Sequence, residues 1–208
     1  SGVAEQLTTA DEGLEQRPES WSADGRTLIF TEGLTGTEHL WSLSLDDDSG
    51  PEPFHVLDDS RQTGGVFSPD GEWVAYGSTE DGNWKIFLQP FPQTGAIYPV
   101  IEEDGLYPVW SPDGSELFYL GPPAPDLLSV QVETEPTFSA RTPESLFDLS
   151  GYTLFANTRR QFDGAPSGDR FVLLRPGVSR QTGDGDAFIG VVIVENWFEE
   201  LKERVPVP

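Results

Sequence analysis

The chain contains no cysteine and no methionine, and only two of its 12 basic residues are lysine. The absence of cysteine excludes disulfides, thiolate nucleophiles and zinc–sulfur sites. An open reading frame begins with methionine, whereas this chain begins Ser1-Gly2, so we expect an excised piece of a longer protein. No apolar run approaches the ~18 residues that a membrane span needs, the longest covering 188–194, so we expect no membrane insertion of this segment.

Basic residues are also scarce relative to acidic ones. The 208 residues include 36 acidic and 12 basic side chains, which gives a formal net charge of −24. Such a chain repels phosphate backbones, so we expect no direct binding to nucleic acid. The 22 glycines and 18 prolines stand beside 36% hydrophobic and 12% aromatic residues. This composition predicts one folded, turn-rich domain built from apolar strands.

A short motif recurs along the chain at nearly regular intervals. It reads Trp-Ser-Ala-Asp-Gly at 21–25, Phe-Ser-Pro-Asp-Gly at 67–71 and Trp-Ser-Pro-Asp-Gly at 110–114, with a decayed copy at 165–168. The final glycines are 46, 43 and 54 residues apart. Proline presets φ, aspartate bonds to the backbone and glycine accepts positive φ, so each copy predicts a tight turn. Each turn precedes a short apolar segment, at 27–30, 73–76, 116–120 and 170–174.

Two further strands complete the repeating unit. Alternating apolar residues predict a third strand at 40–45 and 84–88, and a more polar fourth strand follows at 53–57 and 98–101. Four antiparallel strands per 40–45 residues are typical of β-propeller blades. We therefore predict an all-β propeller of about four four-stranded blades, as a closed ring, an open arc, or a half ring that a second copy completes. The predicted blades cover 17–59, 60–104, 105–150 and 151–208, the last degenerate with a short C-terminal helix from 196 to about 204. Residues 1–16 are predicted to hold the outer strand of a preceding blade plus a linker.

The motif carries a resemblance to a known family. Pro108-Val109-Trp110-Ser111-Pro112-Asp113-Gly114 resembles the Pro-x-Trp-Ser-Pro-Asp-Gly repeat of TolB-like, WD-type β-propellers in bacteria. The segment 196–202, Asn-Trp-Phe-Glu-Glu-Leu-Lys, resembles the terminal tail of propellers fused behind bacterial serine/threonine kinase domains or winged-helix regulators. The resemblance implies the C-terminal portion of a larger protein, and a scaffold that serves many functions.

The sequence lacks the motifs of serine hydrolases and protein kinases. There is no Gly-x-Ser-x-Gly elbow, and the two histidines, His39 and His55, lie in strand-like stretches. There is also no kinase glycine loop, His-Arg-Asp or Asp-Phe-Gly. We therefore predict that this chain alone is not an enzyme.

Acidic clusters raise the possibility of a bound cation. The calcium candidates are Asp46, Asp48, Asp184 and Asp186, but none of them lies in an EF-hand loop. We favour solvated turn acids over a metal site, and we expect no cofactor, with calcium as the alternative.

The innermost strand of a blade lines the central channel of a propeller, so residues just before each turn are the candidate ligand-binding set. They differ between the copies and combine arginine, carboxylate, amide and phenol groups: Arg17, Glu19, Gln62, Thr63, Tyr107 and Arg160. Such groups could hold a peptide terminus or a small polar ligand. A water-filled channel is the alternative. The recurring aromatic residues are expected to pack between blades, namely Trp21, Trp41, Phe67, Trp84 and Trp110.

Together these observations predict a non-catalytic recognition or sensor module that binds a protein, peptide or small polar ligand. The alternatives are an accessory gating propeller of a prolyl-oligopeptidase-type hydrolase and a structural, self-assembling array of blades. A homodimer could complete the ring. The sequence does not fix the compartment, and we favour an extracytoplasmic, periplasmic one.

Overall fold

The computed structural model describes residues 5–34, 36–46, 49–57, 59–121, 126–149, 160, 162–168, 170–176 and 189–195. All regular elements in these ranges are β-strands, arranged in successive antiparallel sheets. The fold is therefore an all-β, incomplete propeller, as the repeats predict. The predicted helix at 196–204 lies outside the described residues. Among those ranges, no helix is long and apolar enough to cross a membrane.

The first two sheets have the four-stranded order of propeller blades. Blade 1 has the order β1-β2-β3-β4, from β1 (Glu15–Trp21), β2 (Thr27–Gly33), β3 (His39–Ser44) and β4 (Pro51–His55). Blade 2 has the order β5-β6-β7-β8, from β5 (Gln62–Phe67), β6 (Trp73–Ser78), β7 (Lys85–Pro90) and β8 (Tyr98–Pro99). Residues 5–8 belong to no strand.

The next two sheets depart from this regularity. Blade 3 is formed by β9 (Leu106–Trp110), β10 (Glu116–Gly121), β11 (Asp126–Glu133), β12 (Ser139–Ala140) and β13 (Glu144–Asp148). Its outer edge is divided, because β12 pairs with one end of β11 and β13 with the other. Blade 4 contributes β14 (Phe162–Gly164), β15 (Arg170–Pro176) and β16 (Ile189–Glu195) in that order.

The repeated motif forms the predicted turn between the first two strands of each blade. In blade 3, Gly114 has φ +74° and the Asp113 carboxylate accepts a 3.1 Å hydrogen bond from the backbone N–H of Ser115. The Ser111 hydroxyl donates to Asp113 at 2.7 Å and accepts from the backbone N–H of Glu116 at 2.9 Å. Blades 1 and 2 repeat these contacts. Serine and aspartate thus satisfy the turn's backbone donors together.

In the described part of the chain, the core consists of three apolar clusters, and each lies between neighbouring blades. The cluster between blades 1 and 2 includes Ile29, Leu40 and Phe67. The cluster between blades 2 and 3 includes Leu88, Trp110 and Leu117, and the one between blades 3 and 4 includes Phe118 and Phe171. Each sheet therefore buries its faces against the next sheet, which explains why one blade alone is not a stable unit.

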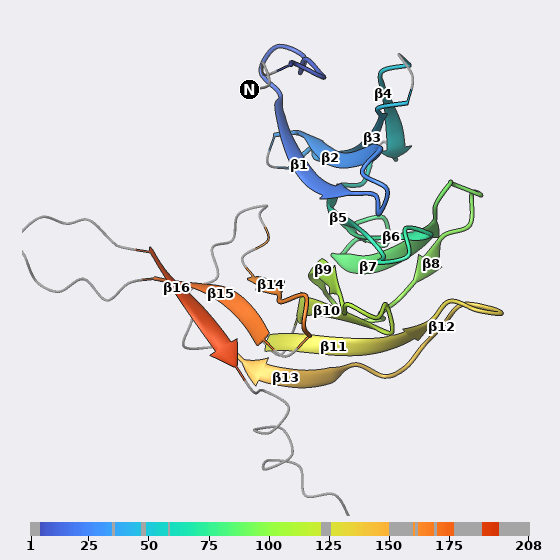
Figure 1. Ribbon diagram of the computed structural model, residues 1–208. Coiled ribbons are helices and arrows are strands. Elements are labelled where there is room, and N and C mark those ends of the chain that lie inside the picture. Colours follow the sequence, from blue (N-terminus) through green and yellow to red (C-terminus); the bar gives the residue numbers. More distant parts are fainter. Residues whose placement is uncertain are drawn as a thin grey trace, which may run out of the picture.

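The blades follow one another along an arc, with β1, β5, β9 and β14 on its inner side (Figure 1). Hydrogen bonds connect these inner strands across the blade boundaries. The Ser20 hydroxyl of β1 accepts from the backbone N–H of Phe67 at 3.2 Å. The Trp110 indole donates to the Val66 carbonyl of β5 at 3.3 Å. The inner strands of the first three blades are thus linked by hydrogen bonds, and they carry the candidate site.

Candidate functional site

A β-bulge interrupts the inner strand of each of the first three blades just before the turn. The pairing shifts at Glu19 in β1, at Gly64 and Gly65 in β5, and at Tyr107 and Pro108 in β9. A bulge inserts one residue and re-aims its neighbours. The three positions are equivalent, six or seven residues before the turn glycine, and two residues of the predicted ligand-binding set, Glu19 and Tyr107, lie in them.

Glu19 lies in the bulge of β1. Its carboxylate accepts a 2.6 Å hydrogen bond from the Thr31 hydroxyl and a further one from the backbone of Gly64. Burial raises the pKa of Glu19, and the two hydrogen bonds and the charges of Arg160 and Arg17 oppose that rise. Arg160 precedes β14 of blade 4, so the electrostatic contact joins the first blade to the last one described.

Tyr107 is the non-glycine residue with positive φ, +58°, in the described part of the chain. Its backbone and ring lie beside Gly64, whose missing side chain leaves room for them. Burial raises the pKa of the Tyr107 hydroxyl to about 12, with further contributions from the Glu19 and Glu38 carboxylates, while Arg17 and Arg61 lower it. The phenol is therefore neutral at physiological pH and sits among four charged groups.

Glu38 and Arg61 belong to this site, although neither is among the residues predicted from the sequence. The Glu38 side chain is 0% exposed, and it accepts hydrogen bonds from Arg61 Nε at 3.1 Å and from the Gly36 backbone at 2.9 Å. The Arg61 guanidinium also lies over the Trp84 ring, 4.7 Å from its centroid. Arg61 directly precedes the predicted pair Gln62 and Thr63, so its position in the sequence could have identified it as a site residue. Glu38 lies in the β2–β3 connection, and no spacing rule points to it.

Gln62 and Thr63 differ in how well their polar atoms are satisfied. Both side chains are buried. The Gln62 amide bonds to His39 Nδ1 at 2.9 Å and donates to the Ser60 hydroxyl, so its polar atoms are used inside the protein. Thr63 Oγ1 is buried and has no hydrogen-bond partner among the described residues.

Arg160 has a second acidic neighbour, and the calcium candidates lie apart from this group or outside the described ranges. Arg160 is also 3.7 Å from the carboxylate of Asp163. Among the calcium candidates, Asp46 pairs with Arg26 at 3.2 Å. Asp48, Asp184 and Asp186 lie outside the described residues. Within the described ranges, no group of three histidine or acidic side chains could hold a metal ion.

We define the inner-strand cluster as Arg17, Glu19, Glu38, Arg61, Tyr107 and Arg160. It contains three arginines and two glutamates, whereas the whole chain has 12 basic and 36 acidic residues. Three of the 12 basic residues of this acidic chain therefore belong to one cluster. Guanidinium groups beside a neutral phenol can hold a carboxylate through charge-assisted hydrogen bonds.

No protein-family profile matches this chain. An uncharacterized protein of Agrobacterium fabrum is 28% identical over 165 residues, which cover 74% of this chain and 53% of that protein. The chain therefore spans about half the length of this curated relative.

Several solved structures have a similar arrangement of strands. TolB from Acinetobacter baumannii is 15% identical, with a TM-score of 0.56 over 88% of this chain and 41% of the other. A puromycin-hydrolyzing peptidase of Mycobacterium tuberculosis is 18% identical, with a TM-score of 0.56 over 88% of this chain and 30% of the other. At such identities the likeness shows the fold alone. The chain therefore has the β-propeller fold found in TolB-type proteins.

Proposed function

We propose that this chain is a non-catalytic recognition or sensor module that binds a protein, peptide or small polar ligand at the inner-strand cluster. The observation that carries the proposal is the concentration of three arginines around Glu19 and Tyr107 in a chain with a net charge of −24. A terminal carboxylate of a peptide suits this site, because arginine forms paired hydrogen bonds with carboxylates.

The module would act within a larger bacterial protein, as the Ser-Pro-Asp-Gly repeat and the chain's coverage of about half of its relative suggest. A kinase or winged-helix domain is the proposed fusion partner, and a periplasmic position of the propeller is part of the same proposal. The similarity to the peptidase structure does not support the alternative, an accessory gating propeller of a hydrolase, because a likeness at 18% identity concerns the fold alone.

The test compares two peptides that differ only at the C-terminus. The probes are acetyl-Gly-Gly-Phe with a free carboxylate and the same tripeptide with a C-terminal amide. Binding is followed by NMR titration of the ¹⁵N-labelled chain. We expect the free acid to bind more tightly, and Arg17→Gln to weaken it by about tenfold, the value of one charge-assisted hydrogen bond.

Arg26→Gln is the matched control, because Arg26 is exposed, pairs with Asp46 on the surface and carries the same charge. It should leave the binding of the acid unchanged. Equal binding of acid and amide, or equal losses in the two arginine variants, would contradict carboxylate recognition at the cluster.

A further inference from the structure

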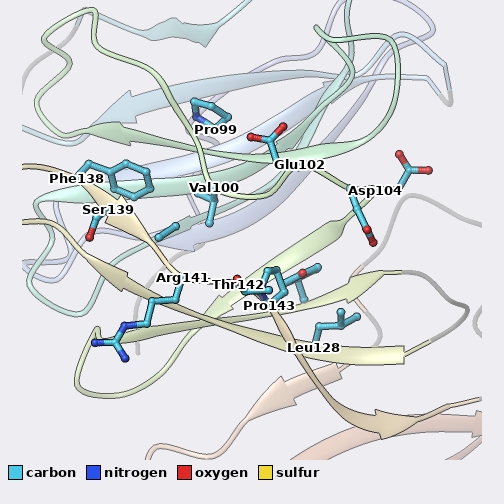
Figure 2. A pocket seen from close by; sticks show the side chains of 13 residues that line it. Pro99, Val100, Glu102, Asp104, Leu128, Phe138, Ser139, Arg141, Thr142 and Pro143 are labelled. Carbon is cyan, nitrogen blue, oxygen red and sulfur yellow. The ribbon is translucent and has the colours of Figure 1, made fainter.

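A second cavity lies away from the inner strands, between the outer parts of blades 2 and 3. It has a volume of about 680 Å³, within the range typical of small-molecule sites. Its walls come from the segment that joins β8 to β9 and from the β12–β13 edge (Figure 2). We call it the blade 2–3 pocket. None of the residues of the inner-strand cluster lines it.

The pocket has chemically different ends. Glu102, Glu103 and Asp104 supply carboxylates from one connecting segment. Figure 2 shows Glu102 and Asp104 at one end, and Phe138 and Arg141 at the other. Buried apolar side chains, including Val100 and Leu128, lie between them. Phe138 is part of an aromatic contact with Tyr98, with ring centroids 5.1 Å apart. The acidic end therefore favours positive charge, and the stretch from Val100 and Leu128 to Phe138 favours an apolar or aromatic body.

Tyr119 supplies an independent indication of a ligand. Its side chain lines the pocket and the residue is only 2% exposed. No described residue forms a hydrogen bond with its hydroxyl. Burial raises the pKa of Tyr119, with a further contribution from the Glu103 carboxylate, so the hydroxyl lies close to the acidic end. The ring rests against Gly105 and Gly121, where an added Cβ would approach ring carbons to 2.9 Å and 3.1 Å.

Tyr76 of blade 2 is equivalent to Tyr119, but its hydroxyl has a hydrogen-bond partner. Tyr76 occupies the same register position in β6, and its hydroxyl accepts a 2.8 Å hydrogen bond from the Gln89 amide of β7. In blade 3, register places Val130 of β11 where Gln89 stands. Valine has no donor or acceptor to offer. The Tyr119 hydroxyl therefore has no protein partner of this kind in blade 3, and a polar group of a ligand in the pocket can supply one.

We propose that the blade 2–3 pocket binds an organic cation with an apolar body, its ammonium group held by the Glu103 carboxylate and the Tyr119 hydroxyl. The apolar body lies along Val100 and Leu128 toward Phe138. A metal ion does not suit the site, because the described acidic side chains provide no set of three ligands. This proposal is independent of the inner-strand cluster and of the function proposed for it.

The experiment uses three probes with the same body and different charges: 4-phenylbutylamine, 4-phenylbutanol and 4-phenylbutyric acid. Their affinities for the whole ¹⁵N-labelled chain are measured by NMR titration. We expect the amine to bind at least fivefold more tightly than the alcohol, and the acid most weakly. The shifted amide signals should map to residues 99–105 and 138–143. The preference for the amine should fall as salt is added.

Two variants test the named groups, and one serves as a control. Glu103→Gln should reduce the ratio of amine to alcohol affinity by about threefold to tenfold. Val130→Gln should lower the affinity for the amine, because it gives the Tyr119 hydroxyl a hydrogen-bond partner inside the protein. Glu52→Gln, at an exposed position on β4 of blade 1, makes the same charge change elsewhere and should change nothing. Equal affinities for the three probes, shifts that map to other residues, or an unchanged preference in Glu103→Gln would overturn the proposal. Circular dichroism checks that each variant is folded.

Discussion

At the scale of single residues, the aspartates of the repeated turns act on their own backbone and not on a ligand. Asp113 accepts hydrogen bonds from Ser111 and from both the hydroxyl and the backbone of Ser115, and these contacts lower its pKa. Asp24 has the same environment in blade 1, and the same kind of contacts lower its pKa. The repeated residues are therefore needed to form the turns of the fold, which is why they recur while the inner-strand residues differ.

The lowered pKa of Asp113 predicts a pH-dependent contribution to stability. A carboxyl group whose pKa falls on folding stabilises the folded state when ionised. The contribution is complete above the ordinary pKa of 3.8 and is lost as the pH falls through the lower folded-state pKa. We expect Asp113→Asn to destabilise by about 0.5–1 kcal/mol above pH 5, because Asp113 is exposed and screened by solvent. The difference in unfolding free energy between the two proteins should become smaller below about pH 4.

Urea unfolding of both proteins from pH 6 to pH 2, followed by circular dichroism, checks this expectation. Other carboxyl groups titrate in the same range, but their contributions are common to both proteins and cancel. Glu52→Gln, at an exposed position, is the control for the loss of one surface carboxylate. A difference in unfolding free energy that stays constant down to pH 2 would show that ionisation of Asp113 does not contribute to stability.

The candidate site could be predicted only in part, and the reason is also visible at single residues. Glu19 and Tyr107 could be predicted, because they lie at a fixed distance before a repeated turn. Glu38 could not, since it reaches the cluster from the β2–β3 connection, through a pairing with Arg61 that only the packed blades create. Tyr119 was predicted as a strand residue, and its unpaired hydroxyl depends on which side chain occupies the register position of Gln89.

At the scale of elements, the turn glycines fix the geometry between the first and second strands of each blade. Gly114 has φ +74°, a conformation that costs a residue with a Cβ about 1–2 kcal/mol. An added Cβ at Gly114 would meet Pro69 at an ordinary 3.6 Å. We therefore expect Gly114→Ala to destabilise by about 1–2 kcal/mol for conformational reasons alone, as measured by urea unfolding.

Gly164 in β14 provides the matched comparison. Its φ is not in the positive range, and an added Cβ would lie 3.7 Å from the Phe171 side chain. Gly164→Ala should be neutral or slightly stabilising, because alanine restricts the unfolded chain. Similar losses in both variants would mean that crowding, and not backbone conformation, sets the cost at Gly114.

The strands themselves were largely predictable, because each follows a recognisable turn. The predicted second strands begin at the residues where β2, β6, β10 and β15 begin. The outer edges were less predictable. Strand β8 covers two residues, and the outer edge of blade 3 is divided between β12 and β13. Outer strands have a partner on one side only, so neighbouring loops decide their length more than their own sequence does.

At the scale of the whole molecule, one blade face differs from its equivalents. Phe67 of blade 2 is buried against blade 1, and its ring lies 5.0 Å from that of Phe91. Trp110 and Val132 of blade 3 are buried against blade 2. The corresponding pair in blade 1 is Trp21 and Leu45, which are 48% and 45% exposed. Trp21 is predicted to pack between blades, but about half of its surface is exposed.

An uncovered blade face of this kind should promote self-association, in line with the proposal that a second copy completes the ring. Burying a tryptophan and a leucine contributes about 3–6 kcal/mol. The double variant Trp21→Ser, Leu45→Ser should therefore weaken self-association by about a hundredfold or more, as measured by light scattering over a range of concentrations. Ile97→Ser removes another exposed apolar side chain, which lies on blade 2, and should leave self-association unchanged. An unsubstituted chain that remains monomeric at the highest concentration would show that this face is not used between copies, and equal effects of the two changes would point to nonspecific contacts.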